Sequence, residues 1–402
     1  MLPSRAEQWH LAILDLLREV NLCQPDRLPQ LISAVTQSLA LDIKIFLVDF
    51  EQRVLHEFGE RSDTSEELPV EGTLAGLAFQ RSEIKPEPGD PRIRWVPLLD
   101  STERLGVLRV ASDQPSAVGS LSAGNPEMQF ANLVGHLIAA KTPYGDRINR
   151  VRSSQPMTVA SVLLRQLLPP STCTSDRIVV SASLQPAYAV GGDAFDYAID
   201  DDSVYAGIFD AVGHDLEAGL SVAVALSAGR AARRNGQSIE SMASAADEQL
   251  ESEFGNSQFV TAVLAQLDLR TGSLRYLNCG HPPPIVLRPQ GGGAEILEGG
   301  RRLPLALRSE GWKEATYRMQ PGDRLMLYTD GVIHARDGRG GFFDVDRLVD
   351  FARRHIRSDE TTPEIARKIN DQVIAFHGDL PDDDATVMLV EWSPAAANLT
   401  AA

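Results

Sequence analysis

The spacing of apolar residues between Trp9 and about Lys141 changes from helical to extended and back to helical. Leu11, Leu14, Leu17 and Val20 recur at helical spacing, and a second helix is expected around Leu28 to Leu39. Runs rich in β-branched and aromatic residues predict strands at 43–50, 54–58, 93–98 and 105–111, and a helix is expected at 128–140. We therefore predict helices flanking a small antiparallel sheet.

Turn-forming and charged residues divide the chain near its first third. A loop containing Gly, Ser, Ala and Pro covers 112–125, and TPYGDRINRVRSSQP follows Lys141. We predict an N-terminal domain over 1–143, a linker over 144–171, a second domain over 172–394 and a tail over 395–402. Within the linker, Pro156 to Leu168 is expected to be helical, with Ser154 available as a cap. This helix either packs within one molecule or pairs with its copy in a homodimer.

From Ile178 onward the pattern alternates between strands and helices, which predicts a layered α+β domain. The expected strands are 179–184, 204–209, 260–268, 274–279, 324–329 and 386–392. The expected helices are 217–234, 239–254, 345–353 and 363–376, the last preceded by Thr362 and followed by Gly378.

Composition narrows the classes of function. A formal net charge of −17 and a sequence pI near 4.9, with no basic run, argue against a nucleic-acid partner. Cys23, Cys173 and Cys279 are far apart and outside any CxxC spacing, which indicates neither a disulfide framework nor a zinc site. No signal-like start or apolar stretch long enough for a membrane span is evident, so we expect a cytoplasmic protein with no membrane contact.

Four aspartates recur at strand ends or beside glycines: Asp193 in VGGDAFD, Asp210 in GIFDAVGHD, Asp330 in LMLYTDGV and Asp383 in DDDATVML. A single aspartate in such a position is ordinary turn chemistry. Converging carboxylates repel one another unless a cation neutralises them, and hard divalent ions prefer oxygen ligands. The repeated pattern therefore predicts a divalent metal site.

The segments GGDAFD, FDAVGH, NCGHPPPIVLR, LYTDGVIHARD and DDATVMLV occur in the order found in the PPM metal-dependent Ser/Thr phosphatases. The chain resembles their bacterial branch that regulates sigma factors, over roughly 157–392. The resemblance implies a four-layer αββα sandwich, with two Mn²⁺ or Mg²⁺ ions between the sheets and a metal-bound water that attacks the phosphoester. The N-terminal pattern, with VEGTLAGLAFQRSEI before two strands, resembles a GAF sensor domain.

Carried over by this resemblance, Asp210 bridges both metals and the Ala211 carbonyl binds one of them. Asp330 and Asp383 complete the other ion's shell, and Asp193 acts directly or through metal-bound waters. Asp382 and Asp384 are interpreted as solvated loop charges. The implied substrate is a phosphoserine or phosphothreonine protein, expected to be an anti-sigma antagonist of the STAS type.

Several positions depart from the family. Val212 stands where eukaryotic relatives have a histidine used as general acid, and we interpret the nearby His214 as structural. Asp215 replaces a glycine at a helix start, where a carboxylate is favourable. Arg177 is expected to be too distant to bind phosphate, and His334 follows Asp330-Gly331 where the branch has an acidic or hydroxyl residue. His281 is predicted to be a packed, hydrogen-bonded histidine.

Two other functions compete with this hypothesis. GGDAF also resembles the GGDEF signature of diguanylate cyclases, but it stands alone here. A phosphatase fold that has lost activity and only sequesters a signalling partner is the more serious rival, and Asp215 is the feature that favours it. GAF pockets of similar pattern bind cyclic nucleotides, haem, small aromatics or nothing, so the sequence names no ligand.

Overall fold

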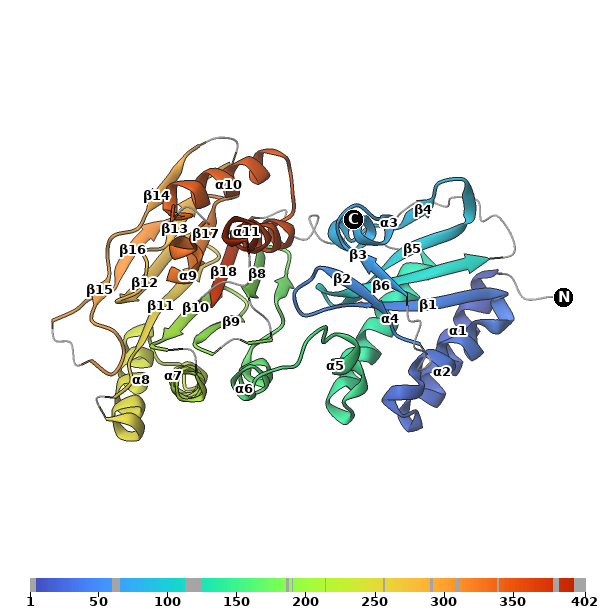
Figure 1. Ribbon diagram of the computed structural model, residues 1–402, viewed down its shortest axis with the longest axis horizontal. Coiled ribbons are helices and arrows are strands. Elements are labelled where there is room, and N and C mark those ends of the chain that lie inside the picture. Colours follow the sequence, from blue (N-terminus) through green and yellow to red (C-terminus); the bar gives the residue numbers. More distant parts are fainter. Residues whose placement is uncertain are drawn as a thin grey trace. The chain divides into compact units, whose positions relative to one another are not determined.

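The structure is a computed structural model, and it describes residues 5–59, 66–112, 125–185, 188–189, 191–213, 215–255, 257–289, 292–307, 311–337, 340–378 and 383–393. His214 and Asp382 lie outside these residues. The chain divides after Pro156 into two compact units, which we describe separately (Figure 1). Among the described helices, none is both long enough and apolar enough to span a bilayer.

The N-terminal unit contains an antiparallel six-stranded sheet in the order β3-β2-β1-β6-β5-β4. Its strands are β1 (Leu41–Val48), β2 (Val54–Glu57), β3 (Glu67–Pro69), β4 (Lys85–Glu87), β5 (Asp90–Asp100) and β6 (Glu103–Ser112). Its helices are α1 (Arg5–Glu19), α2 (Leu28–Thr36), α3 (Leu74–Arg81), α4 (Pro126–Lys141) and α5 (Arg147–Val151).

Both faces of this sheet are covered. In β1, Ile43 and Ile45 join the core with α1, α2 and α4, whereas Phe46 and Val48 join the core with α3. This alternation follows from the two-residue period of a strand. The prediction of helices flanking an antiparallel sheet is confirmed.

The predicted first helix is confirmed as α1, but three of the four residues that indicated it do not face the core. Leu11, Leu14 and Leu17 are 43–50% exposed, whereas Trp9 and Leu16 are buried in the core. Both sets have helical spacing, so periodicity alone cannot choose between them.

The predicted linker is shared between the two units. Its first part forms α5, whose Ile148 is fully buried in the N-terminal core, and the Phe50 N–H donates to the Arg152 carbonyl. Its second part forms α6 (Val159–Leu167), which belongs to the C-terminal unit. Thr158, rather than Ser154, caps α6, because its hydroxyl accepts from Ser161 N at 3.1 Å.

The C-terminal unit contains two six-stranded sheets. The first has the order β15-β12-β11-β10-β9 with β16 beside β12, and the second β14-β13-β17-β18-β8-β7. The strands are β7 (Thr172–Thr174), β8 (Ile178–Gln185), β9 (Asp193–Ile199), β10 (Ser203–Ala211), β11 (Val260–Asp268), β12 (Ser273–Cys279), β13 (Ile285–Leu287), β14 (Ala294–Ile296), β15 (Arg301–Arg302), β16 (Ala315–Arg318), β17 (Arg324–Tyr328) and β18 (Ala385–Trp392).

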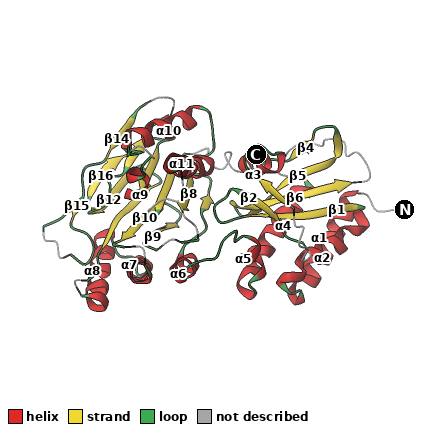
Figure 2. Cartoon of the chain, viewed as in Figure 1, coloured by secondary structure: helices red, strands yellow, loops and turns green. Residues whose placement is uncertain are grey.

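Helices cover the outer face of each sheet, so the unit has four layers (Figure 2). The remaining helices are α7 (Leu216–Arg234), α8 (Ile239–Phe254), α9 (Asp330–His334), α10 (Val345–Arg357) and α11 (Thr362–His377). α7 and α8 pack on the first sheet, and α10 and α11 pack on the second. In β18, Met388 faces the core between the sheets, whereas Val387 faces the helices. Every strand and helix expected after Ile178 is present.

Candidate metal centre

The ends of two neighbouring strands bring Asp193 and Asp210 together. β9 begins at Asp193 and runs antiparallel to β10, so Asp193 and Asp210 are directly opposite each other. On its other side, Asp210 is opposite Thr261 of β11. At one end of these three strands, the first sheet therefore presents two acidic residues and a hydroxyl.

Asp193 connects the two sheets. Its Oδ2 accepts hydrogen bonds from the hydroxyls of Thr329 and Thr386, both at 2.7 Å, and these residues belong to the second sheet's side of the site. The Thr386 N–H in turn donates to Thr329 Oγ1 at 2.9 Å. A buried carboxylate with such donors fixes the spacing of the two sheets at this end.

Asp384 is not a solvated loop charge, and that interpretation is wrong. Only 6% of Asp384 is exposed, and its Oδ2 accepts from the backbone N–H groups of Gly191 and Gly192, each at 2.8 Å, and of Asp193 at 3.4 Å. This one oxygen therefore holds the backbone that leads into β9. Asp384 is a structural partner of the predicted ligand Asp193.

The other three predicted aspartates share one cavity. Asp210, Asp330 and Asp383 line a space of about 340 Å³, together with Ala211, Val212, Gly213, Phe259 and Thr261. Asp193 is not part of this lining and is almost completely buried. The structure thus brings three of the four predicted carboxylates, and the segment of the predicted carbonyl ligand Ala211, to a common space.

The proximity of these acids makes the charged state costly. Burial, followed by repulsion from Asp330, Asp383 and Asp384, raises the pKa of Asp210 to about 8. Burial and the charges of Asp210 and Asp384 raise the pKa of Asp193 well above its ordinary value. A divalent cation reverses this penalty, because it stabilises the ionised carboxylates.

The donor set fits a hydrated Mg²⁺ or Mn²⁺. It consists of hard oxygen ligands around a space that holds several waters, and such ions retain part of their hydration shell. Within the described residues, however, no three acidic, histidine or cysteine side chains already converge to hold a metal ion. The carboxylates would therefore bind the ions partly through water.

Two glycines allow close approach of backbone at the cavity. A Cβ on Gly331 would lie 2.0 Å from the Asp384 carbonyl oxygen, and one on Gly192 would lie 3.0 Å from that of Ala211. Gly331 is in the first turn of α9 and has no positive φ. Its function is therefore close packing between the Asp330 and Asp383 segments rather than a turn.

The structure gives the surroundings of three residues that depart from the family pattern. Val212 lines the cavity and is 45% exposed, so the side chain in the eukaryotic histidine position has no ionisable group. Asp215 caps α7, since its Oδ1 accepts from Glu217 N at 3.0 Å and from Ala218 N at 3.1 Å. His334 Nδ1 lies 3.6 Å from Asp330 Oδ2, and both side chains are exposed.

Arg177 lies away from the acidic cluster. It precedes β8, whose Ile178 pairs with Trp392, whereas Gln185 at the other end pairs with Ala385 beside Asp384. Seven residues of strand span roughly 23 Å. Arg177 instead pairs with Asp202, so the prediction that it is too distant to bind phosphate at the cavity is supported.

His281 is a packed, hydrogen-bonded histidine, as predicted. Its Nδ1 lies 2.8 Å from Thr261 Oγ1, its Nε2 lies 3.0 Å from the Tyr328 carbonyl, and its backbone N–H donates to Asn278 Oδ1. Burial lowers the pKa of His281 to about 3, so the ring is neutral. It links Thr261 of β11, which is opposite Asp210, to β17, which leads to Asp330.

Sequence reasoning missed Asp384, Thr329, Thr386, Phe259 and Thr261. Thr329 directly precedes Asp330, and Thr386 follows the DDDA run, so their positions beside the motifs were an available signal. Thr261 becomes visible only through the pairing of β10 with β11.

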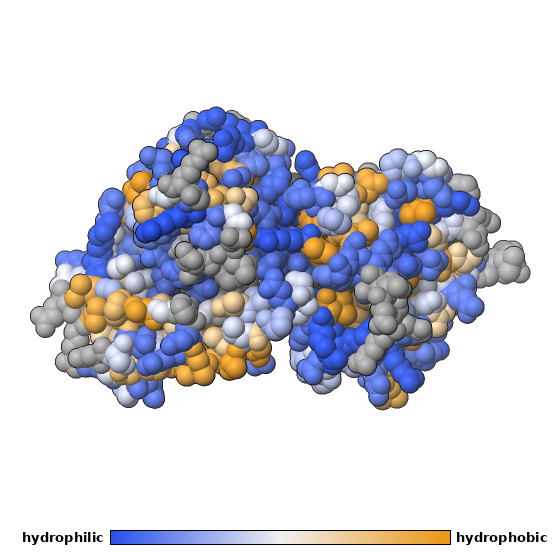
Figure 3. All heavy atoms as spheres, viewed as in Figure 1, coloured by the Kyte–Doolittle hydropathy of each residue, from blue (hydrophilic) through white to orange (hydrophobic). Residues whose placement is uncertain are grey.

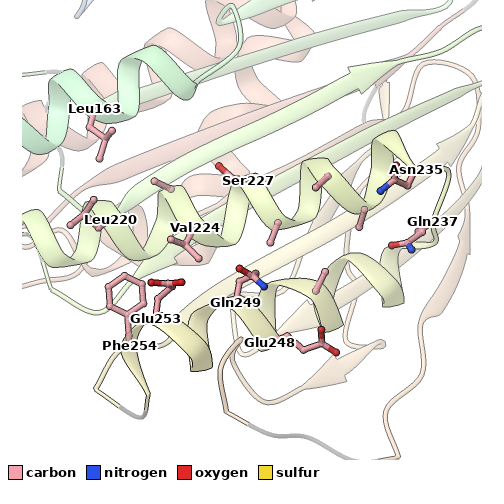
Figure 4. Close-up of a pocket in the computed structure, with 15 residues that line it drawn as sticks. Leu163, Leu220, Val224, Ser227, Asn235, Gln237, Glu248, Gln249, Glu253 and Phe254 are labelled. Atoms are coloured by element: carbon pink, nitrogen blue, oxygen red, sulfur yellow. The ribbon is translucent and has the colours of Figure 1, made fainter.

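A second cavity, of about 850 Å³, lies between α7 and α8. Its lining is largely apolar, and Figure 4 shows Leu163 of α6 and Leu220 of α7 near one end of it, with Phe254 of α8 close by. Exposed apolar side chains continue on α6 and the start of α7, at Val159, Val162, Leu216 and Leu220. Figure 3 shows apolar side chains along this lower edge of the unit. This surface has the character of a packing surface rather than a reaction site.

The chain is similar to several known proteins, one of which is a phosphoserine phosphatase. Residues 200–393 match the family model of Stage II sporulation protein E (SpoIIE). Over 233 residues the chain is 21% identical to phosphoserine phosphatase RsbU of Bacillus subtilis, covering 58% of this chain and 68% of RsbU. Over 135 residues it is 27% identical to protein IcfG of Synechocystis, covering 33% of this chain but only 21% of IcfG.

A solved structure supports the fold. The SiaA PP2C domain of Pseudomonas aeruginosa superposes with a TM-score of 0.50 at 22% identity, over 63% of this chain and 99% of that domain. The SpoIIE match contains Asp210, Asp330 and Asp383, the three carboxylates of the cavity. Over residues 200–393 this chain is similar to the SpoIIE family, and its C-terminal unit has the fold of a PP2C-type phosphatase.

Proposed function

We propose that the C-terminal unit is a metal-dependent protein phosphatase that hydrolyses phosphoserine or phosphothreonine of a partner protein. The observation that supports it most is that Asp210, Asp330 and Asp383, from three separate segments, line one cavity. The name of RsbU, a phosphoserine phosphatase, supports phosphoserine as the substrate residue. A phosphorylated anti-sigma antagonist of the STAS type remains the proposed partner.

In this proposal two Mn²⁺ or Mg²⁺ ions supply a water that is easily deprotonated and neutralise charge on the phosphoryl oxygens. Burial and the charges of Asp330 and Asp383 raise the pKa of Asp210, and these three carboxylates would together hold the ions. Asp330, Asp383 and the Ala211 carbonyl hold them from the cavity wall. Asp193, which is opposite Asp210 in the first sheet, holds the two sheets together through the hydrogen bond that it accepts from Thr329.

The leaving group receives its proton from solvent in this proposal. Val212 cannot donate one, and the cavity lining contains no histidine, lysine or tyrosine among the described residues. His214, outside the described residues, stays predicted as structural. The chemistry consequently depends on the ions and on positioning.

The rival function, a partner-sequestering protein without activity, loses its main support. It was favoured by Asp215, but this carboxylate caps α7 and does not line the cavity. Hydrolysis of p-nitrophenyl phosphate by the full chain with Mn²⁺ distinguishes the two. Metal-dependent turnover that is lost in Asp210→Asn supports the phosphatase, and binding of a phosphoprotein without turnover supports the rival.

We also propose that the N-terminal unit, which we interpret as GAF-like, regulates the site through α6. Leu164 of α6 is buried in the same core as Phe209 and Ala211 of β10. A Cβ on Gly219 of α7 would lie 3.1 Å from Ala160 Cβ of α6 and 3.2 Å from the Gly191 carbonyl. A shift of α6 therefore reaches the backbone that precedes Asp193.

The test compares the full chain with one that begins at Met157. A chain that begins at Thr172 is unsuitable, because it removes Leu164 from the core. Regulation predicts different turnover and different half-saturation by Mn²⁺ on the same phosphoprotein, whereas identical values contradict it. Pairing of α6 in a homodimer stays a separate prediction, which analytical ultracentrifugation of the full chain tests.

A further inference from the structure

Thr261 is a cavity residue to which the proposed function gives no role. It is the second residue of β11, directly opposite Asp210, and it lines the cavity with Asp210, Asp330 and Asp383. A threonine hydroxyl has one hydrogen to donate and two lone pairs that accept. Which of these points to the cavity depends on the neighbours of Thr261.

The tautomer of His281 follows from its contacts. The Tyr328 carbonyl can only accept, so the Nε2 that lies 3.0 Å from it carries the hydrogen. The ring is buried, and it contacts a carbonyl and a hydroxyl rather than a carboxylate, so it is neutral. A neutral ring with hydrogen on Nε2 has only a lone pair on Nδ1.

Nδ1 must therefore accept the hydrogen of Thr261, at 2.8 Å. This commits the single hydroxyl hydrogen, and the 3.4 Å approach of Thr261 Oγ1 to the Asp210 carbonyl oxygen cannot be a good hydrogen bond. The hydroxyl oxygen is left with lone pairs only. At the cavity wall Thr261 acts as an acceptor and cannot donate.

We propose that Thr261 is a positioning residue whose hydroxyl oxygen accepts a hydrogen bond from a water bound to a divalent ion in this cavity, and that His281 holds it in this role. A water on a divalent ion is a strong donor, because the ion draws electron density from it. An oriented acceptor fixes that water's rotation. This inference rests on the proposed function only for the presence of the ion.

The decisive comparison uses two variants of the full chain. Thr261→Val keeps the β-branched shape but removes the acceptor, whereas Thr261→Ser keeps the hydroxyl. Partners behind metal ligands typically change metal affinity or activity by about 10–100-fold. We expect Thr261→Val to weaken Mn²⁺ binding, measured by calorimetry without substrate, by roughly 10-fold, and Thr261→Ser by less than about 3-fold.

Thr261→Ser should melt near the wild type, whereas Thr261→Val leaves Nδ1 of the buried His281 without its donor and should melt roughly 2–12 °C lower. Thr316→Val, at an exposed position of β16 away from the cavity, is the matched control and should leave Mn²⁺ affinity unchanged. Wild-type Mn²⁺ affinity in Thr261→Val overturns the proposal. Because binding is measured without turnover, this outcome is separate from a failure of the proposed phosphatase activity.

A spectroscopic measurement tests the other half of the inference, and it needs no variant. In ¹⁵N-labelled full chain, we expect His281 to show a protonated Nε2 and an unprotonated Nδ1 at neutral pH. A protonated Nδ1 overturns the proposal, because the Thr261 hydrogen would then be released toward the cavity. This result stands even where Thr261→Val does not fold.

Discussion

Two groups of aspartates at the same end of the C-terminal unit differ in what surrounds them. Asp193 and Asp384 are buried and accept hydrogen bonds from protein donors, two hydroxyls for Asp193 and three backbone N–H groups for Asp384. Asp210, Asp330 and Asp383 line a cavity. The first group joins segments of the chain, and the second is available to a ligand.

This difference shows that an acidic motif contains two kinds of function. Protein donors stabilise a buried carboxylate and make it part of the framework. A carboxylate that faces a polar cavity beside two others is stabilised best by a cation. Adjacent residues, Asp383 and Asp384, belong to different groups, so a position in the motif does not by itself identify a ligand.

The largest expected effect separates the groups by activity. Asp210→Asn should lower Mn²⁺-dependent kcat by at least about 10³-fold, because loss of a metal-held charge costs several kcal/mol in the transition state. The metal-free protein should melt no lower than the wild type, since a repelled charge has been removed. Turnover of p-nitrophenyl phosphate and a thermal melt measure both.

Asp215→Asn is the control for that substitution. Asparagine is also a good helix cap, so the turnover rate should stay within a few-fold of the wild type and the melting temperature should stay near it. Near-normal Mn²⁺-dependent activity of Asp210→Asn would show that the site has been assigned to the wrong residue.

Asp384→Ala should affect stability most. It leaves the N–H groups of Gly191, Gly192 and Asp193 without their acceptor, and an unsatisfied buried group costs about 1–3 kcal/mol. Urea denaturation measures this loss. Asp383→Ala, its neighbour in the cavity group, should lose activity without a comparable loss of stability, and equal stability losses in both variants argue against the division into two groups.

Gly331→Ala tests whether the two groups must lie in close contact. The new methyl group would lie 2.0 Å from the Asp384 carbonyl, so the Asp330 and Asp383 segments must separate, at a cost of about 1–3 kcal/mol. Gly229→Ala in α7 is the matched control, because its nearest neighbour is Met242 Cε at 3.7 Å. The control should be neutral or more stable by up to about 1 kcal/mol, and a loss in both variants would point to a general effect of alanine.

The smallest effect concerns pH. Asp210 has a folded pKa of about 8, above its ordinary value of 3.8, so its protonated form is favoured by folding. Its contribution to stability is full below pH 3.8 and is lost as the pH rises toward 8. As the pH rises, the melting temperature of the metal-free protein should therefore fall by roughly 2–4 °C for each kcal/mol of unfolding free energy that is lost. Mn²⁺ should raise the melting temperature more at pH 8 than at pH 5. A Mn²⁺ effect that shrinks as the pH rises contradicts this.

Sequence patterns predicted the elements of the C-terminal unit because its central strands and covering helices are strongly periodic. β10, β17 and β18 are apolar runs that end at or begin beside the aspartates, so the ligand positions follow from the strands. β9 was not predicted, since DAFDYAI combines acidic and aromatic residues without a clear alternation. Its existence depends on pairing with β10.

Other features depend on tertiary contacts that no local pattern contains. Asp384 accepts from residues more than 190 positions earlier in the chain. The buried face of α1 is chosen by contact with Phe130 of α4, whose ring packs against that of Trp9 at a tilt of 55°, with ring centroids 5.3 Å apart. The segment 144–156 has the composition of a linker, but burial of Ile148 makes it part of a core.

The position of β18 in its sheet has a consequence for how the protein is made. β18 is the last strand among the described residues, but it lies between β17 and β8, and it pairs with β8 across some 200 residues of sequence. Thr386, which donates to Asp193, is the second residue of β18, and Asp383 lies two residues before the strand begins. Contacts between such distant segments form late and slow folding. During translation, β8 and β17 therefore remain without the strand that lies between them. The metal centre cannot assemble until synthesis has passed Trp392.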